Sequence, residues 1–181
     1  MKDIGVLRNI AVDEVQLILA WRNAPSVRAN MYTQHKISLE EHLRWWERIQ
    51  AAEDQRYLMY EIARRPCGVV AFNRIDRASQ NAFWAFYAAP DAAMGVGAKM
   101  EFLAIEHAFS DLLLHKLQCE VLAFNATVIK LHTKFGFKPE GVFKAQQKVA
   151  DGFVDVHRLG LLRSEWQELQ PKMAAKIKAL N

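Results

Sequence analysis

The sequence has few of the residues that mark a fibrous, low-complexity or disulfide-stapled chain. It holds 2 cysteines, 8 glycines and 5 prolines in 181 residues, whereas 51% of the residues are hydrophobic. Collagen-like and disordered classes are therefore excluded, because the apolar fraction is sufficient for a packed core. Cys67 and Cys119 form no C-x-x-C pattern and have no zinc-ligand spacing. We expect both to be reduced, buried thiols.

Long apolar runs and runs of one charge are also missing. No stretch approaches the roughly 20 apolar residues that cross a bilayer, and the N-terminus carries acid and base inside its apolar run, unlike a signal peptide. The 24 basic and 20 acidic residues give a net charge of +4, spread so evenly that no basic tract occurs. A nucleic-acid partner needs clustered positive charge. We therefore expect a cytoplasmic protein with no nucleic-acid and no membrane partner, folded as one domain over residues 1–181.

Hydrophobic periodicity in the first part of the chain predicts a strand and two helices. Residues 4–10 are typical of a strand, and a short helix follows with Val15, Ile18 and Leu19 on its apolar side. Residues 38–51 begin with capping-box spacing, Ser-Leu-Glu-Glu, and continue as a helix. The expected buried face of this helix comprises Leu39, Leu43, Trp46 and Ile49.

Three strand-like runs follow, at residues 57–63, 68–76 and 83–88. Arg64–Cys67 is the predicted turn between the first two, and a polar turn separates the second from the third. Because the connections are short, we expect an antiparallel meander.

After residue 90 the pattern changes to helix, strand and helix. A long helix follows Gly97, residues 116–122 form a strand, and residues 125–135 form a helix that ends at Gly136. A strand–helix–strand crossover makes its two strands parallel. The expected buried face of the long helix comprises Phe102, Ile105, Phe109, Leu112 and Leu113.

The chain ends with a predicted hairpin and a helical tail. Residues 141–149 and 153–161 flank Asp151-Gly152, which is a strong hairpin signal, and the tail covers residues 163–180. The predicted fold class is α/β (α+β): a single domain with one mixed, twisted central sheet of about seven strands flanked by helices.

The first feature with chemical meaning is the pair Gly95 and Gly97, which follows a strand and opens a helix. Backbone N–H groups and the positive dipole end attract an anion at such a place, and glycine lets a phosphate approach closely. A short G-x-G pattern also occurs in turns that bind nothing. Both interpretations stand at this point.

A second motif follows the next strand, at residues 125–137: Asn-Ala-Thr-Val-Ile-Lys-Leu-His-Thr-Lys-Phe-Gly-Phe. Together with the glycine turn it resembles the GNAT superfamily of N-acetyltransferases, in which a strand, a pyrophosphate loop and helix, a strand, and an N-x-x-(A/S)-I-x-L-Y-x-x-x-G-F segment occur in this order. The resemblance covers nearly the whole chain. It implies the GNAT fold, with acetyl-CoA as cosubstrate in the cleft between two splayed parallel strands.

The resemblance also implies which positions hold acetyl-CoA: Ala88, Met94, Gly95, Val96, Gly97, Ala98, Asn125 and Lys134. Asn125 would bond the pantetheine or an ordered water, and it would also serve as a helix N-cap. Lys134 reaches the nucleotide phosphates in one interpretation and is a solvated helix charge in the other.

Two positions depart from the family pattern. Ala92 stands three positions before the first loop glycine, where the superfamily has Arg or Gln, so one side-chain contact to the pyrophosphate is missing. His132 stands where the superfamily usually has a tyrosine. An imidazolium of pKa about 6.5 is a stronger acid than a thiol of about 8.5, so His132 is the candidate catalytic acid for the departing thiolate. The alternative is a core or solvent-facing histidine, with water protonating the thiolate.

The first half of the chain resembles one branch of the superfamily, which holds the ribosomal-protein N-terminal acetyltransferases and the nucleotide-aminosugar acetyltransferases. The segments that carry this resemblance are Trp21–Asn23, Val27–Tyr32, Ile37–His42, Arg56–Leu58, Gly68–Val70, Asn73–Ile75 and Phe86–Tyr87. The last four favour the aminosugar enzymes of pseudaminic acid synthesis and flagellin modification. Their acceptor is UDP-4-amino-4,6-dideoxy-N-acetyl-β-L-altrosamine.

The resemblance places the acceptor on Arg22, His42, Asn73, Arg74 and Tyr87. Arginine suits a UDP diphosphate because its planar fork binds phosphate bidentately. Each position also has a purely structural interpretation: Arg22 ends a helix, His42 lies on an amphipathic helix, and Tyr87 alternates into a sheet face.

Three functions stay open. The first is an acetyl-CoA-dependent N-acetyltransferase of a 4-amino UDP-aminosugar, with direct amine attack in a ternary complex and a water chain as base. The second acetylates a protein N-terminus and needs an open groove with acidic groups. The third is a CoA-binding module without turnover. We expect no metal, because His107, His115 and His157 lack metal-ligand spacing, and a monomer or homodimer.

Overall fold

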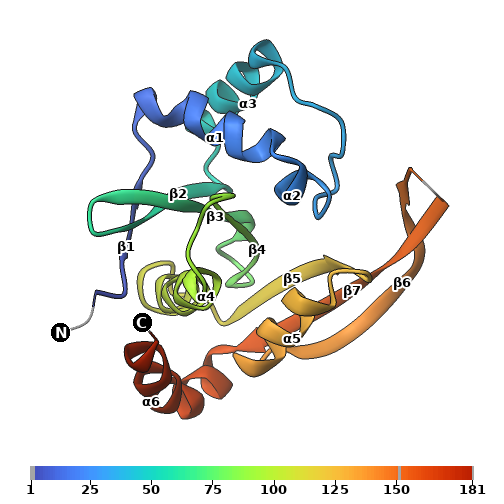
Figure 1. Cartoon of the computed structure of the whole chain (residues 1–181). Helices are drawn as coiled ribbons and strands as arrows, with labels where there is room; N and C mark the ends of the chain where they lie inside the picture. Colours follow the sequence, from blue (N-terminus) through green and yellow to red (C-terminus); the bar gives the residue numbers. More distant parts are fainter. Residues whose placement is uncertain (1–2, 151, 181) are drawn as a thin grey trace.

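The computed structural model describes residues 3–150 and 152–180 (Figure 1). One seven-stranded sheet has the order β1-β2-β3-β4-β5-β7-β6. β4 and β5 are parallel, and the other neighbouring strands are antiparallel. The strands are β1 Val6–Asn9, β2 Arg56–Ile62, β3 Arg65–Asp76, β4 Asn81–Ala88, β5 Lys116–Leu122, β6 Lys138–Val149 and β7 Gly152–Leu162. This sheet confirms the predicted α/β fold class.

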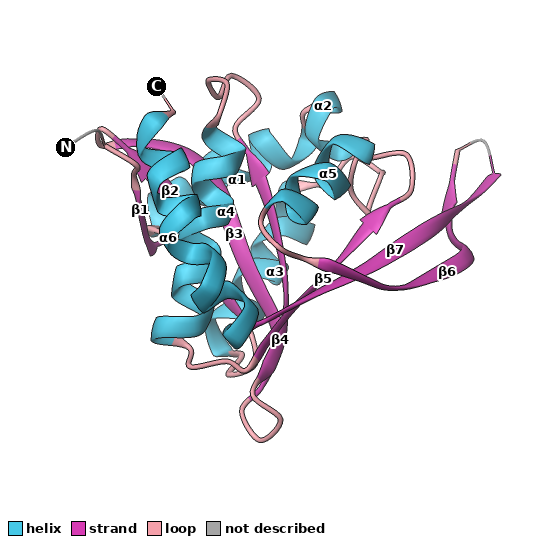
Figure 2. Ribbon diagram, turned by 90° about the horizontal axis from the view of Figure 1, so that it is seen from below, coloured by secondary structure: helices cyan, strands magenta, loops and turns pink. Residues whose placement is uncertain are grey.

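Helices lie on both sides of the sheet (Figure 2). They are α1 Val15–Asn23, α2 Pro25–Arg28, α3 Leu39–Ala51, α4 Val96–Glu106, α5 Ala126–Lys134 and α6 Arg163–Ala179, with a 3₁₀ turn at Val12–Glu14 and a π-helical turn at His107–Asp111. In the described ranges, no helix is both long enough and apolar enough to pass through a membrane.

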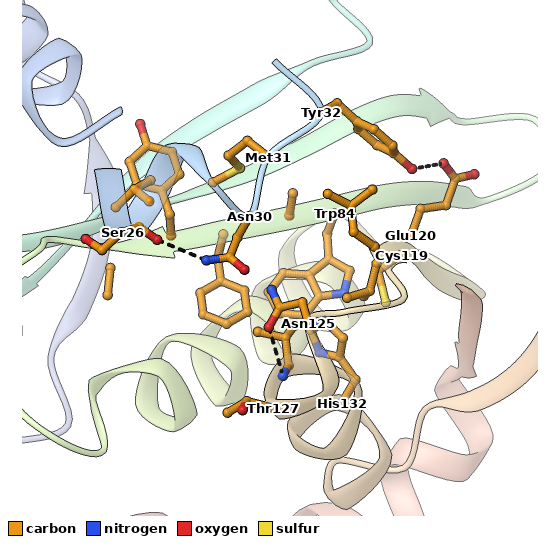
Figure 3. Close-up of a pocket in the computed structure, with 18 of the residues that line it drawn as sticks. Ser26, Asn30, Met31, Tyr32, Trp84, Cys119, Glu120, Asn125, Thr127 and His132 are labelled. Atoms are coloured by element: carbon orange, nitrogen blue, oxygen red, sulfur yellow. Dashed lines mark hydrogen bonds between the residues drawn. The ribbon is translucent and has the colours of Figure 1, made fainter. Parts of the chain in front are cut away.

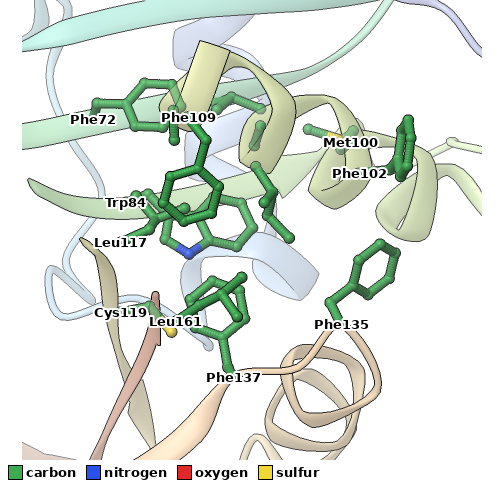
Figure 4. Packing of buried hydrophobic residues seen from close by; sticks show 14 of the residues in the cluster. Phe72, Trp84, Met100, Phe102, Phe109, Leu117, Cys119, Phe135, Phe137 and Leu161 are labelled. Carbon is green, nitrogen blue, oxygen red and sulfur yellow. The ribbon is translucent and has the colours of Figure 1, made fainter. Parts of the chain in front are cut away.

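The strand period of two divides the buried side chains between the two faces. In β2, Leu58 and Tyr60 join the main core with α4, α5 and α6, whereas Met59 packs with Ile18 and Trp21 of α1. Figure 4 shows the aromatic centre of the main core. Both cysteines are free and buried, as expected.

The predicted turn at Arg64–Cys67 is wrong, because β3 already begins at Arg65. The chain reverses at Ala63 and Arg64, whose φ angles are 50° and 62°. Two residues with positive φ make the tight hairpin connection whose twist matches the strands. Neither is Gly, Asn or Asp, so a search for those residues misses the turn.

The predicted buried face of the long helix is confirmed at Phe102, Ile105 and Phe109. It is wrong at Leu113, which is 60% exposed. α4 ends at Glu106, and His107–Asp111 continues as a π-helical turn. This wider turn changes the helical phase. Leu114 is buried instead.

The predicted apolar face of α3 is wrong at Leu39 and Leu43, which are exposed. His42 and Ile49 are buried. His42 takes the inward position because its ring Nε2 donates to the Val15 carbonyl at 2.9 Å. The predicted helix bounds and the Ser38 cap are confirmed.

The last hairpin and the tail helix are confirmed, although β6 begins at Lys138, three residues before its predicted start. Asp151 of the predicted turn lies outside the described residues. In Figure 2 the β6–β7 hairpin extends well beyond the helices.

Candidate active site

β4 and β5 separate after a short parallel contact. They pair only at Asn81–Lys116, Ala82–Leu117 and Phe83–Gln118 within the described residues, although β4 continues to Ala88 and β5 to Leu122. The far edge of β4 is bonded to β3. Alternate backbone groups of β4 beyond the contact therefore face the gap and are available to a ligand.

A cavity of about 390 Å³ lies at this gap (Figure 3). The diverging halves of β4 and β5 line it, together with the start of α5 and the segment around α2. Ala88, Asn125 and His132, all predicted from the sequence, belong to the lining. The sequence therefore locates the opening of the sheet and the strand ends that form it.

The other predicted phosphate-binding positions lie where α4 begins. Gly95 is the N-cap of α4, with a φ of 89° that L side chains rarely adopt. Across the described ranges, the N–H groups of Gly97 and Ala98 donate to no protein acceptor. These N–H groups and the helix dipole form a setting for a pyrophosphate. Lys134 is exposed at the end of α5 and does not line the cavity.

The predicted N-cap role of Asn125 is confirmed, and its role toward the pantetheine stays a prediction. Its side-chain oxygen accepts from the Val128 N–H at 3.4 Å and caps α5. The residue also lines the cavity. The cap fixes the start of α5 against the end of β5, and so fixes where His132 points.

His132 is buried, with 3% of its surface exposed, and its ring packs among Trp84, Phe86 and Phe137. Its Nδ1 lies 2.8 Å from Oε1 of Glu101, which comes from the middle of α4. Glu101 has no exposed surface. Burial raises the pKa of the Glu101 carboxyl, and the hydrogen bond from His132 partly opposes that change. A histidine that lines the cavity and a fully buried carboxyl group thus share one hydrogen bond.

A second cavity, of about 460 Å³, lies between α1, α3 and the sheet. Tyr87 lines both cavities, so they adjoin at this residue. Arg22, Arg44 and Arg48 line the second cavity, with one carboxylate, Glu41. The lining therefore carries an excess of positive charge.

Arg22 is the unusual member of this lining. Its Nη1 is buried and has no hydrogen-bond partner among the described residues. Its Nη2 reaches the Thr33 carbonyl at 3.4 Å. Burial lowers the pKa of Arg22, and the groups that act against this shift are the hydroxyls of Tyr57 and Tyr87, not a carboxylate. An anion in the cavity would supply the missing partner.

The other predicted acceptor residues lie at different places. His42 lines the second cavity but is tied to Val15 and stacks on Trp45, with ring centroids 4.8 Å apart. Asn73 accepts from the Tyr57 hydroxyl at 3.0 Å and so orients a lining residue. Arg74 lies outside both linings, with its guanidinium over the Phe83 ring.

Two carboxylates near the first cavity were not predicted from the sequence: Glu120, which lines it, and Glu101, which is buried behind His132. Glu101 stands inside an apolar helix, which is a signal for a buried charge that requires a partner. Glu120 follows Cys119 on β5 and accepts from the Tyr32 hydroxyl. No sequence pattern links Glu120 to Tyr32. In the described part of the chain, His, Cys, Asp and Glu side chains form no group of three suited to a metal ion.

Comparison with known proteins agrees with this geometry. The family model described as an acetyltransferase (GNAT) domain matches residues 6–138. The acetyltransferase PseH from two strains of Campylobacter jejuni is 29% and 30% identical over 124 residues, which cover 68% of this chain and 76% of each relative. Among solved structures, the spermidine N-acetyltransferase from Vibrio cholerae in complex with CoA and spermine has a TM-score of 0.84 at 21% identity, covering 90% of this chain and 97% of the other. The chain belongs to the GNAT family and is an acetyl-CoA-dependent N-acetyltransferase.

Proposed function

We propose that this N-acetyltransferase acts on the 4-amino group of a UDP-aminosugar, and that UDP-4-amino-4,6-dideoxy-N-acetyl-β-L-altrosamine is its acceptor. The similarity to PseH supports this acceptor. The first half of the chain resembles the nucleotide-aminosugar acetyltransferases, the branch that includes PseH. The reaction would belong to pseudaminic acid synthesis and flagellin modification.

The observation that carries the proposal is the buried, unpartnered Nη1 of Arg22 in a cavity with two further arginines. Leaving a buried donor unsatisfied is costly, so such groups commonly meet a ligand. A diphosphate offers several anionic oxygens in the geometry that a guanidinium binds. The sugar would extend from there past Tyr87 to the cleft, because Tyr87 lines both cavities.

Acetyl-CoA would lie along the gap between β4 and β5, with its pyrophosphate at the first turn of α4 and its thioester near His132. The neutral acceptor amine attacks the thioester carbonyl carbon, the carbon–sulfur bond breaks, and His132 protonates the thiolate. The amine proton leaves through water. Held next to each other, the two substrates react without a covalent enzyme intermediate.

The same fold also carries polyamine acetylation in Vibrio cholerae, as the names of the similar structures state. A polyamine is a cation, and the arginine-rich second cavity repels it. A protein N-terminus is likewise cationic before deprotonation. The charge of the second cavity therefore favours the nucleotide sugar over both.

Two measurements test the acceptor. Isothermal calorimetry should detect UDP binding to the wild type and at least tenfold weaker binding to Arg22→Met, since loss of a bidentate contact costs about 1.4 kcal/mol or more. Arg77→Met, an exposed arginine outside the second cavity, is the matched control and should bind UDP normally.

A thiol-release assay with acetyl-CoA should show turnover of the UDP-aminosugar and much slower release with spermidine or N-terminal peptides. Turnover of a peptide or polyamine without UDP binding would replace the acceptor and keep the enzyme class. His132→Phe should remove most of the turnover. If the protein binds acetyl-CoA but transfers the acetyl group to no amine, and if His132→Phe leaves that binding unchanged, the protein is a CoA-binding module instead.

A further inference from the structure

We propose that Glu101 is a positioning residue that acts through His132, keeping a proton on the ring Nε2 for transfer to the CoA thiolate. This inference rests on the proposed role of His132 as the acid. It deepens that role, because the family resemblance placed no carboxylate behind this position.

The geometry limits what Glu101 can do. The carboxyl of Glu101 has no exposed surface, so it reaches neither solvent nor the cavity lining. Its one hydrogen bond within the described residues joins Oε1 to Nδ1 of His132 at 2.8 Å. Nε2 is the ring nitrogen left over, and His132 lines the cleft. Any effect of Glu101 on the reaction must therefore pass through the His132 ring.

The surroundings of the pair contain few charges. The rings of Trp84 and Phe86, both on β4, pack against the ring of His132. Phe137, the residue before β6, packs against it as well. The titratable group that faces Glu101 from β5 is the Cys119 thiol, whose pKa is raised by burial and also by the Glu101 charge. The pair thus lies in an apolar site with little compensating charge.

In such a site the pair is most stable when its total charge is zero. A carboxylate beside an imidazolium has zero net charge, and so has a carboxylic acid that donates to Nδ1 of a neutral ring. In both forms the second ring nitrogen, Nε2, carries a proton. Removing that proton leaves one uncompensated negative charge. Glu101 therefore favours the states of the pair in which Nε2 carries a proton.

The transfer balances with no further reactant. The amine lone pair forms the carbon–nitrogen bond, the carbon–sulfur bond breaks with its electron pair on sulfur, and the sulfur takes the Nε2 proton. The surplus proton on the new amide nitrogen returns through water to Nε2. Amine and acetyl-CoA become amide and free CoA thiol, and the Glu101–His132 pair is unchanged.

Glu101→Gln tests the inference, with Glu106→Gln as the matched control. Glu106 lies on the same helix and accepts from Trp166 and Gln170. For Glu101→Gln we expect the alkaline limb of the kcat–pH profile to move down by about one unit and kcat at pH 8 to fall about tenfold. The KM for acetyl-CoA should change less than about threefold. Glu106→Gln should leave the profile in place.

Two further measurements separate this inference from the acceptor assignment and from misfolding. ¹⁵N-histidine NMR of the acceptor-free protein should show that His132 loses its Nε2 proton at lower pH in Glu101→Gln than in the wild type. In a double-mutant cycle, Glu101→Gln should cost nothing further once His132 is Gln. Identical His132 titration in both proteins, or equal additional loss in the double mutant, would overturn the inference even if the UDP-aminosugar is the acceptor. If Glu101→Gln does not fold, Glu101→Asp takes its place, and an unshifted His132 titration there counts equally against it.

Discussion

The Tyr32 hydroxyl donates a 2.9 Å hydrogen bond to Oε2 of Glu120 and joins two parts of the chain that lie 88 residues apart. Tyr32 belongs to the segment 29–37, here called the strap. Gln147 of β6 donates to the Tyr32 carbonyl at 3.3 Å. At the other end of the strap, Ile37 exchanges two 2.8 Å hydrogen bonds with Asn23. Residues of the strap line both cavities, so its anchoring sets how open they are.

Tyr32→Phe removes the side-chain anchor and keeps the ring. One net hydrogen bond is worth about 0.5–1.5 kcal/mol, so we expect the KM for the acceptor to rise about two- to tenfold. The melting temperature should change little, because the pair is exposed. Steady-state kinetics gives the KM, and hydrogen exchange should become faster within residues 29–37. A normal KM with unchanged exchange would mean that the strap does not depend on this contact.

Gly95→Ala should weaken acetyl-CoA binding and the fold together. An added Cβ at Gly95 meets no atom within 4 Å, so the cost comes from the φ of 89° and amounts to about 1–2 kcal/mol. Gly97→Ala is the matched comparison, because its Cβ would make ordinary contacts with Phe86 and Leu131. We expect thermal unfolding to separate the two, with a clear loss of stability only for Gly95→Ala. Equal loss in both would show that left-handed geometry is not the reason for Gly95.

Local signals in the sequence were sufficient for the cleft-forming elements. The capping residue Asn125, the glycine at Gly95 and the parallel crossover each depend on residues close in the chain, and each has its predicted place. Which residue pairs with His132 depends on the relative phase of two helices whose bonded residues lie 31 positions apart. A glutamate in an apolar helix shows that a partner is needed, and only the packing of α4 against α5 shows that the partner is His132.

The predicted acceptor residues show the same division. Arg22 and Tyr87 line the second cavity, but Arg74 lies over Phe83 because residue 74 has a φ of 51° where β3 and β4 lose register. Such an irregularity redirects one side chain without altering the strand pattern that the sequence displays. The role of Arg74 in acceptor binding stays a prediction.

Folding stability should fall as the pH drops below about 6.5, and His42 is one cause. Burial lowers the pKa of His42, while the unfolded chain keeps the ordinary value near 6.5. Between the two values the unfolded state binds more protons, so stability is present above about pH 6.5 and is lost as the pH falls. His107 contributes with the same sign, because burial also lowers its pKa. Glu101 has the opposite effect on stability. Burial raises its pKa, so its contribution is lost as the pH rises above the ordinary value of a glutamate.

His42→Gln keeps an N–H donor for Val15 and removes the titration. We expect its unfolding free energy to vary less between pH 7.5 and pH 5.5, by up to about 1.4 kcal/mol for each pH unit that His42 accounts for. Urea unfolding at several pH values measures this, with the exposed His115→Gln as control. An unchanged pH dependence in His42→Gln would assign the effect to other groups.

Arg22→Met should stabilise the unliganded protein although it weakens UDP binding. The buried Nη1 has no partner among the described residues, and the remaining 3.4 Å contact to Thr33 is long, so the charge of Arg22 is costly before a ligand arrives. Methionine keeps the aliphatic volume and removes that cost. We expect a gain of about 1 kcal/mol, which corresponds to a melting temperature about 2–4 °C higher for a chain of this size. UDP at one fixed concentration should raise the melting temperature of the wild type more than that of Arg22→Met. A lower melting temperature for unliganded Arg22→Met would mean that the guanidinium supports the fold, and the second cavity would then lose its strongest sign of an anionic ligand.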